Sequence, residues 1–271
     1  MLIVLIAYYP IIDSIQISVT NLSIFTDEFI GLKNFVEYLS SPLFWNNLLV
    51  TVGMAIIQIS GSFSIGFALA LLLNMKFRGR GFVRSLLIVP WAVPGVAASL
   101  IFAWIYDYQF GALNYTLRQI GLIQKNVGWL TDPGVALFSV SIVGVWQLFP
   151  VAMTFILAGL QSVPESLYEA AKIDGAGRLL RFRHITLPSI RPVILMLLLF
   201  LTIFSWGGFV VGFMLTGGGP ARSTENFQLA IYQNAFHYFQ FGYAATIGVI
   251  TLAIMLALGI IYLKYGEVKV Y

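Results

Sequence analysis

Residues 162–188 read SVPESLYEAAKIDGAGRLLRFRHITLP, and this charged segment lies between two long stretches, 133–161 and 192–221, that carry no ionisable side chain. The Glu, Ala and Lys residues in its first half are good helix formers. Asp174-Gly175 predicts the end of that helix, because glycine adopts the left-handed conformation of a helix C-cap. A second short helix is predicted after the turn. The segment is therefore expected to form a helix–turn–helix outside the apolar regions.

The ends of these two helices carry their own signals. Ser162 and Glu165 have the spacing of a capping box, and Pro164 would lie in the first turn, where a missing N–H does little harm. Leu187-Pro188 is expected to stop the second helix before the next apolar stretch.

The composition of the 271-residue chain excludes an ordinary soluble protein. Hydrophobic residues make up 59% of it and charged residues only 10%, whereas soluble domains are about 25% charged. Charge this sparse cannot cover a surface that faces water, so long apolar stretches are interpreted as membrane-spanning helices. The net charge of +4 is explained by basic cytoplasmic loops and does not indicate nucleic-acid binding.

Six spans are predicted, at about 1–19, 47–73, 84–106, 134–161, 193–215 and 243–264. Eleven of the 15 Lys and Arg residues lie in 74–84, in 162–192 and in the C-terminal tail; the other four are Lys33, Arg118, Lys125 and Arg222. This bias predicts that both termini and the 162–192 loop are cytoplasmic. A single membrane domain, 1–271, is the simplest organisation.

Several signatures of self-sufficient function are missing. The interiors of the last five predicted spans contain no ionisable residue, which argues against proton coupling and voltage sensing. The chain lacks the phosphate-binding pattern G-x-x-x-x-G-K-[ST] and the hydrolase patterns H-E-x-x-H and G-x-S-x-G. Energy for active transport would therefore come from a partner. The alternatives left open are an ion-coupled secondary transporter or channel, with sodium held by backbone carbonyls, and a membrane scaffold or enzyme subunit without transport.

The spacing within the charged loop resembles a known motif. The pattern E-A-A-x3-G-x9-I-x-L-P is that of the EAA loop of ABC importer permeases. The loop of this chain resembles it, with Glu169-Ala170-Ala171 at the start, Gly175 after three intervening residues, Ile185 after nine more, and Leu187-Pro188 at the end. Asp174-Gly175-Ala176 followed by Phe182 is similar to the carbohydrate branch of that family, which includes the larger membrane subunit of the maltose transporter. Further similar stretches are Phe29–Phe35, Phe77–Pro90 and Leu215–Pro220.

The resemblance implies a fold and a set of partners. The fold would be that of an all-α, six-helix type I ABC importer permease with a cytoplasmic coupling-helix (EAA) loop, in a bacterial or archaeal cytoplasmic membrane. The chain would move a sugar, a di- or oligosaccharide or related glycoside, and would not itself be an enzyme. Its partners would be a second permease of different sequence, two copies of a cytoplasmic ATPase that bind ATP and Mg, and an extracytoplasmic sugar-binding protein. The residues that would couple to the ATPase are Glu169, Ala170, Ala171, Asp174, Gly175, Ile185, Leu187 and Pro188.

Polar and aromatic residues within the spans are candidates for the substrate path. Sugars are bound by hydrogen bonds and aromatic faces, and polar groups inside a membrane are costly unless they are used. The candidates are Gly144, Trp146, Gln147, Leu148 and Val151 in the fourth span and Thr202, Ser205 and Trp206 in the fifth. Gly144, Leu148 and Ser205 coincide with sugar-contacting positions of the maltose-type subunit, but Leu201 replaces a contacting serine there, which argues against a maltose-like pose. Helix packing is the competing interpretation for Trp146, Trp206, Thr202 and Ser205, whereas Gln147 is harder to explain without a role in the path.

Overall fold

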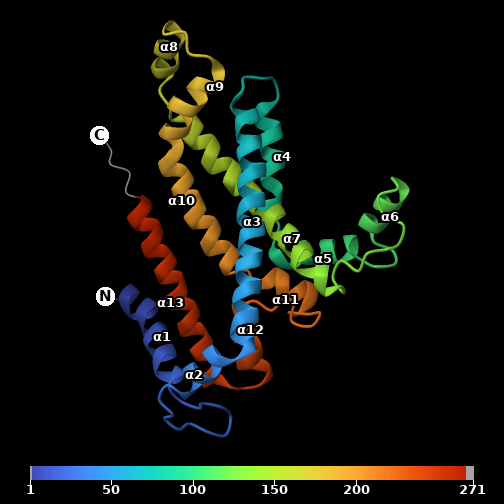
Figure 1. Ribbon diagram of the computed structural model, residues 1–271, viewed down its shortest axis with the longest axis vertical. Helices are drawn as coiled ribbons and strands as arrows, with labels where there is room; N and C mark the ends of the chain where they lie inside the picture. The colour runs from blue at the N-terminus through green and yellow to red at the C-terminus, as the bar shows by residue number, and fades with distance from the viewer. Residues whose placement is uncertain (1, 267–271) are drawn as a thin grey trace.

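The computed structural model describes residues 2–266, and within that range the chain consists of helices, turns and two isolated β-bridges (Figure 1). The prediction of an all-α chain is confirmed. The two longest helices are α3 (Pro42–Asn74) and α7 (Pro133–Gln161). The other elements, in chain order, are α1 (Leu2–Ser18), α2 (Lys33–Ser40), α4 (Arg80–Ala92), α5 (Gly95–Ile105), α6 (Ala112–Gln119), α8 (Glu165–Ile173), α9 (Arg178–Arg181), the π-helix η1 (Phe182–Thr186), α10 (Leu187–Trp206), α11 (Val210–Thr216), α12 (Phe227–Tyr232), the π-helix η2 (Gln233–His237) and α13 (Phe241–Gly266).

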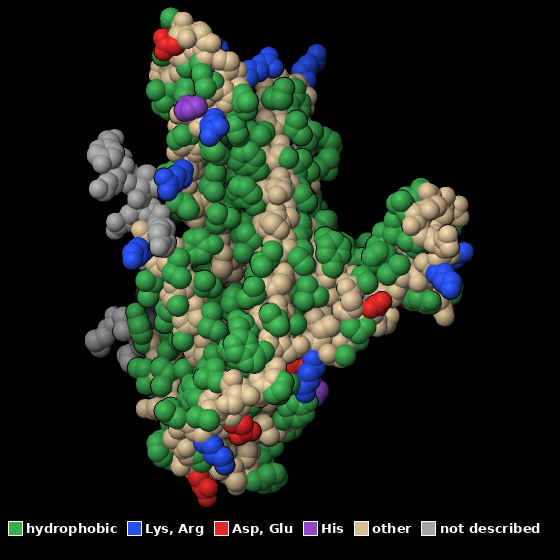
Figure 2. Space-filling view, viewed as in Figure 1, with side chains coloured by type: hydrophobic (Ala, Val, Ile, Leu, Met, Phe, Trp, Pro, Cys, Tyr) green, Lys and Arg blue, Asp and Glu red, His purple; other side chains and the backbone are tan. Residues whose placement is uncertain are grey.

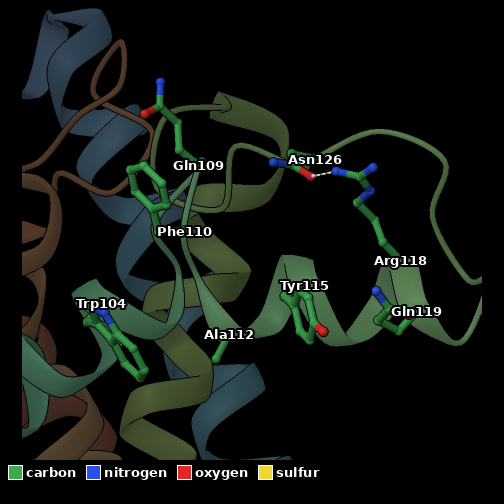
Figure 3. A pocket seen from close by; sticks show the side chains of 8 residues that line it. All are labelled: Trp104, Gln109, Phe110, Ala112, Tyr115, Arg118, Gln119 and Asn126. Carbon is green, nitrogen blue, oxygen red and sulfur yellow. Dashed lines mark hydrogen bonds between the residues drawn. The ribbon is translucent and has the colours of Figure 1, made fainter.

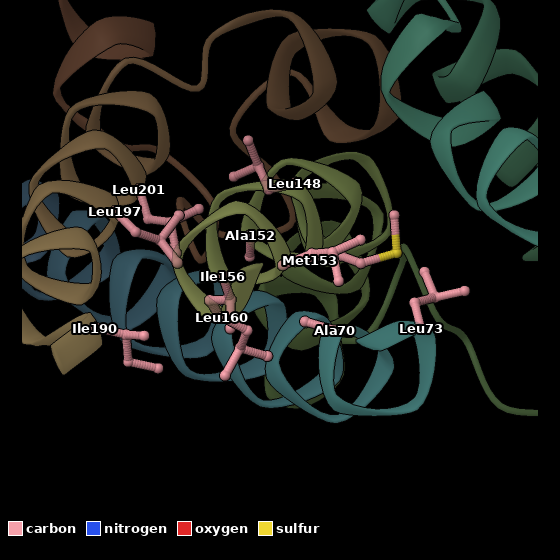
Figure 4. Close-up of a cluster of buried hydrophobic side chains, with 11 residues drawn as sticks. Ala70, Leu73, Leu148, Ala152, Met153, Ile156, Leu160, Ile190, Leu197 and Leu201 are labelled. Carbon is pink, nitrogen blue, oxygen red and sulfur yellow. The ribbon is translucent and has the colours of Figure 1, made fainter. Parts of the chain in front are cut away.

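The centre of the bundle is the contact between α3 and α7, where glycine permits a close approach. A Cβ atom on Gly66 would lie 2.6 Å from the Cβ of Ala152 and 2.7 Å from the backbone nitrogen of Met153. Small residues of this kind draw helices together in a bilayer, where lipid tails remove the hydrophobic driving force between helices. An apolar core from α3, α7 and α10 surrounds the contact (Figure 4). Its buried members are Ala70, Leu73, Leu148, Ala152, Met153, Ile156, Leu157, Leu160, Ile190, Leu197 and Leu201.

Four helical stretches of the described chain are long and apolar enough to cross a membrane. They are Pro42–Asn74, Pro133–Gln161, Arg178–Thr216 and Phe241–Tyr262, and the bent pair α4 and α5 makes a fifth if it is counted as one span. The first predicted span, 1–19, corresponds to α1, whose 17 residues pack along α13; residue 1 lies outside the described residues. The count of six spans therefore stays a prediction.

The third predicted span, 84–106, coincides with the bent pair α4 and α5 and not with one continuous helix, and its place as a single span stays a prediction. The axes of α4 and α5 differ by 94°. Val93 is extended, with φ −75° and ψ 124°, because the ring of Pro94 disfavours a helical residue before it. Pro94 also has no N–H to donate to the preceding turn. The chain consequently leaves α4 at Ala92 and restarts at Gly95 in a new direction.

The fifth predicted span, 193–215, also contains a break. Helix α10 ends at Trp206, and residues 207–209 separate it from α11. Two consecutive glycines, Gly207 and Gly208, explain the interruption, since each disfavours a helix interior by about 1 kcal/mol relative to alanine. At its other end α10 begins at Leu187, earlier than predicted.

The loops between the long helices lie at the two ends of the bundle. Helices α8 and α9 and the turn between α3 and α4 lie at one end, and α2 and α12 lie towards the other (Figure 1). Figure 2 shows Lys and Arg side chains at the first end. The two loops on which the predicted orientation rests therefore share one end of the molecule.

Candidate coupling hairpin and substrate path

Residues 165–186 form a hairpin at the end of the bundle that carries the basic loops. Helix α8 is the first arm, and the second arm runs from α9 through η1 into α10 without interruption. The prediction that Leu187-Pro188 stops the second helix is therefore wrong. Pro188 lies within this continuous helix, directly after the π-helix η1, where the N–H of Leu187 donates to the carbonyl of Phe182 five residues earlier.

The predicted capping box at the start of α8 does not form. The Ser162 hydroxyl donates to the Gly159 carbonyl at 2.9 Å, and the residue before α8 is Pro164, which makes no side-chain cap. Ser162 still belongs to the last turn of α7, since its N–H donates to Ala158. Ser162 is therefore the C-cap of α7 and not the N-cap of α8.

The turn of the hairpin is as predicted. Gly175 has φ +78°, the left-handed conformation that suits glycine. The N–H of Gly175 donates to Lys172 at 3.1 Å, and that of Ala176 donates to Ala171 at 2.8 Å. These two bonds satisfy carbonyls at the end of α8.

The hairpin leaves an apolar surface uncovered. Ile173 is 87% exposed and Leu179 is 79% exposed, and no residue of α8 or α9 is buried. A cavity of about 330 Å³ lies between its arms, lined by Ala171, Ala176, Leu180, Arg181, His184 and Ile185. Among the described residues the Arg181 Nε is buried without a hydrogen-bond partner. Uncovered apolar side chains beside a polar group that lacks an acceptor favour a protein partner.

The predicted coupling residues lie on this hairpin or at its base. Of these, Glu169, Ala170, Asp174, Gly175, Leu187 and Pro188 are exposed, and Ala171 and Ile185 are half-buried. The structure thus brings together residues up to 19 positions apart on one projecting element. Their contacts with a partner stay a prediction.

Within the bundle, the two helix breaks meet. A Cβ atom on Gly95, at the start of α5, would lie 3.2 Å from a methyl carbon of Val210, at the start of α11. Non-helical backbone at membrane depth is tolerated only inside protein or along a water-filled cavity, and in transporters it marks substrate sites. The fourth predicted span, α7, packs against both broken helices.

Gln147 on α7 reaches one of these breaks. Its Nε2 donates to the carbonyl of Val93 at 3.4 Å, an oxygen that the bend in the α4–α5 pair leaves without a helical partner. The amide is half-buried. Gln147 therefore stabilises the bend between α4 and α5 in this conformation. Its role in the substrate path stays a prediction.

Gly144, one turn before Leu148, accommodates a polar side chain that the sequence analysis missed. A Cβ atom at Gly144 would lie 2.5 Å from the Cδ of Gln58, which is only 7% exposed. An amide in the middle of an apolar helix was the available signal, because it is expensive in lipid without a partner. Gln58 of α3 thus lies against Gly144 of α7, three residues before Gln147, whose amide reaches the break at Val93.

The remaining path candidates are mostly buried in helix packing. Gly144, Leu148, Val151, Thr202, Ser205 and Trp206 are buried, and Trp146 is half-buried with its ring against Phe102. The Thr202 hydroxyl lies 2.8 Å from the Leu198 carbonyl and 3.0 Å from the Tyr262 hydroxyl of α13. Trp206 stacks on Phe227 at 6.1 Å, whereas Leu148 shares the core cluster with Leu201. These candidates therefore divide between the α7 and α13 sides of α10.

Two buried atoms in this region lack a partner. In residues 2–266 the Ser205 Oγ and the Trp206 Nε1 form no hydrogen bond. Both stand at the end of α10, directly before the Gly207–Gly208 break. Buried polar groups without partners cost free energy, so this end of α10 has unused hydrogen-bonding capacity.

A polar clasp, made of Tyr38, Asn47 and Glu225, closes the opposite end of the bundle from the hairpin. The Tyr38 hydroxyl donates to Asn47 Oδ1 at 2.9 Å, and Asn47 Nδ2 donates to the Glu225 carbonyl at 2.8 Å. Burial, and to a smaller extent neighbouring Tyr243 and Glu225, raises the pKa of Tyr38, so its hydroxyl stays protonated as a donor. The clasp fixes the loop that precedes α12 against α3.

An arm, residues 107–132, extends from the end of α5 away from the bundle (Figure 1). Its centre is the buried Asn114, which donates to Val127 at 3.0 Å and accepts from the Trp129 indole at 3.0 Å. A cavity of about 510 Å³ opens on the arm, lined by Trp104, Gln109, Phe110, Ala112, Tyr115, Arg118, Gln119 and Asn126 (Figure 3). None of the predicted path residues lines this cavity or the hairpin cavity.

Comparison with known proteins gives a consistent result. Residues 62–265 match the family described as "Binding-protein-dependent transport system inner membrane component". The chain is 36% identical over 268 residues to a sulfoquinovosyl glycerol transport system permease of Agrobacterium fabrum, covering 98% of this chain and 86% of that protein. It is also 36% identical over 241 residues to a trehalose/maltose transport system permease of Thermococcus litoralis, covering 89% and 81% respectively.

Solved structures share the fold. A chain from a bacterial ABC transporter that imports the acidic polysaccharide alginate has a TM-score of 0.86 at 22% identity, covering 100% of this chain and 93% of that one. A chain from the alginate transporter in complex with a pentasaccharide-bound periplasmic protein has a TM-score of 0.83, also at 22% identity, covering 96% and 88%. The expectation of an ABC importer permease fold is therefore confirmed.

Proposed function

This chain belongs to the family of binding-protein-dependent transport system inner membrane components, and we propose that within it the chain imports a di- or oligosaccharide or a related glycoside. It is a permease subunit of an ATP-driven ABC importer, a multi-pass membrane component and not an enzyme. The sugar class is supported by the two permease relatives, whose transport systems are named for sulfoquinovosyl glycerol and for trehalose and maltose.

The proposed path runs beside the two helix breaks. Ser205 and Trp206 precede one break with unpaired polar atoms, and Gln147 reaches the other at Val93. We propose that a second permease of different sequence completes the path, because most of the candidate residues are closed off within one chain. Rigid-body motion of the two permeases would then expose the path to each side in turn.

The single observation that carries the coupling part of this proposal is the projecting hairpin. Its uncovered Ile173 and Leu179 would dock on a cytoplasmic ATPase, with Glu169, Ala170, Asp174 and Gly175 at the contact. Two ATPase copies would bind ATP and Mg, and the permease would carry no cofactor. Since the hairpin arm continues into α10, closure of the ATPase pair would move the helix that ends at the break.

The hairpin end is proposed to face the cytoplasm of a bacterial or archaeal cell, with both termini on that side. The basic residues at that end support this orientation. The clasp end would then face outward, where an extracytoplasmic binding protein would deliver the sugar.

The test is co-purification from native membranes in mild detergent, followed by mass spectrometry. We expect a second permease and an ATPase in stoichiometric amounts, and uptake of trehalose, maltose or sulfoquinovosyl glycerol when the binding protein is added. Glu169→Lys should leave membrane insertion intact and lose the ATPase. A chain that purifies alone and transports sugar in liposomes with an ion gradient would establish the secondary-transporter alternative instead.

A further inference from the structure

One side-chain hydrogen bond joins the two arms of the hairpin. The hydroxyls of Tyr168 on α8 and Thr186 in η1 lie 2.9 Å apart. Among residues 2–266 it is the only side-chain hydrogen bond between α8 and any other helix. Thr186 is 7% exposed and is the one buried residue of η1. The buried hydroxyl of Thr186 needs a hydrogen-bond partner, and the half-buried Tyr168 of the otherwise exposed α8 provides it.

The two arms of the hairpin are attached to the bundle in different ways. The second arm is continuous with α10 through η1, and the ring of Phe182 in η1 makes an edge contact with Phe67 of α3 at 6.2 Å. The second arm is thus anchored to two spanning helices. Helix α8, in contrast, leaves α7 at an uncapped start and reaches α9 through a turn that contains Gly175 and Gly177.

A force applied to α8 therefore has two routes to α10. One passes through the glycine turn, which bends easily because glycine has the largest conformational freedom. The other passes through the Tyr168–Thr186 bond, which lies at the base of the hairpin where α10 begins. The π-helix at that point widens the turn, and such π-segments occur frequently at functional sites.

We propose that Tyr168 and Thr186 are positioning residues that fasten α8 to α10, so that the hairpin moves as one body with the spanning helix. The inference rests on the proposed function, since it assigns a role within ATPase coupling. Neither residue touches substrate in this role. Both act through α8, whose exposed surface contacts the ATPase.

The test uses the complete transporter with its partner subunits. Tyr168→Phe removes one oxygen and keeps the ring, and Thr186→Val keeps the shape without the hydroxyl. Thr186→Ser retains the hydroxyl and should behave as wild type. Ser189→Ala is the matched control, because Ser189 donates only to Ile185 within its own helix at 2.6 Å.

The first readout is hydrogen exchange of the α8 amides, which needs no knowledge of the sugar. Tyr168→Phe and Thr186→Val should each raise exchange in 165–173 by about fivefold, the equivalent of about 1 kcal/mol for a neutral hydrogen bond. The double variant should show no further increase, because both changes break the same bond. Wild-type exchange in either single variant, or additive effects in the double variant, would overturn the proposed contact.

The second readout is the number of sugar molecules imported per ATP hydrolysed, with maltose or trehalose as the probe. The ratio should fall several-fold in Tyr168→Phe and Thr186→Val while ATPase co-purification persists. Raised exchange with an unchanged ratio would reduce the bond to a purely structural contact and refute its role in coupling. Failure of wild-type uptake would contradict the proposed function instead, and the exchange data would still decide the contact.

Discussion

The turn of the hairpin offers a perturbation whose size follows from one backbone angle. Gly175 has φ +78°, and a Cβ atom added there would meet no atom within 4 Å. Gly175→Ala therefore introduces no clash and acts through the backbone alone. The left-handed conformation is about 1–2 kcal/mol less favourable for a residue with a Cβ, which lowers the occupancy of the native turn about 5- to 30-fold relative to alternatives.

We expect this change to reduce sugar uptake per ATP hydrolysed in proteoliposomes that hold the complete transporter. Gly175→Asn should be milder, since asparagine visits the left-handed region more readily than alanine. Gly79 provides the matched control. It has φ +85° with no atom within 4 Å of its added Cβ, and it lies in the turn before α4. Gly79→Ala thus imposes the same backbone strain outside the hairpin.

The reasoning makes a ranked prediction: coupling should decrease from wild type through Gly175→Asn to Gly175→Ala, with Gly79→Ala near wild type. An equal loss of coupling in Gly175→Ala and Gly79→Ala would show that backbone strain anywhere at this end of the bundle lowers coupling, and that the hairpin turn has no special role. Full coupling in Gly175→Ala would refute the role of the turn outright.

Three other predictions concern the bundle and the arm. Gly66→Ala should lower the melting temperature by several degrees, since overpacking at the α3–α7 contact costs about 1–3 kcal/mol, whereas Gly248→Ala, with open space at its Cβ, should not. Asn114→Ala should accelerate trypsin cleavage of the arm at Arg118 and Lys125, because it removes the contacts to Val127 and Trp129; unchanged cleavage would contradict that role. Gln147→Leu should reduce transport while the ATPase still co-purifies, because the Val93 carbonyl loses its donor; unaltered uptake would contradict this.

The sequence predicted the hairpin well because its signals are local. The Gly175 turn depends on one residue's conformational freedom, and the helices on either side have good formers. The capping box failed because Ser162 was already in use by α7, where its hydroxyl bonds Gly159. Which of two helices a boundary residue joins is decided by tertiary packing, so a spacing rule alone could not assign it.

The effect of each proline on its helix was also not predictable from the local sequence. Pro188 was expected to stop the second helix of the hairpin, yet that helix continues through it into α10. Pro150 likewise lies inside α7 without ending it. The sharp bend comes instead at Pro94, where Gly95 follows and Val210 of α11 packs against it. A proline bends a helix when the surroundings accept the new direction, and those surroundings are distant in sequence. The sequence analysis missed Gln58 for the same reason, because its neighbour Gly144 is distant in sequence.

The central claim is that ATP hydrolysis in a partner, acting through the 165–186 hairpin, drives sugar uptake by this chain. The most direct measurement is uptake of labelled maltose, trehalose or sulfoquinovosyl glycerol into proteoliposomes, with the binding protein outside and ATP at the ATPase side. The account predicts uptake that requires ATP and the ATPase and that Glu169→Lys abolishes. Uptake by this chain in the absence of the ATPase, driven by an ion gradient and unaffected by Glu169→Lys, would contradict it.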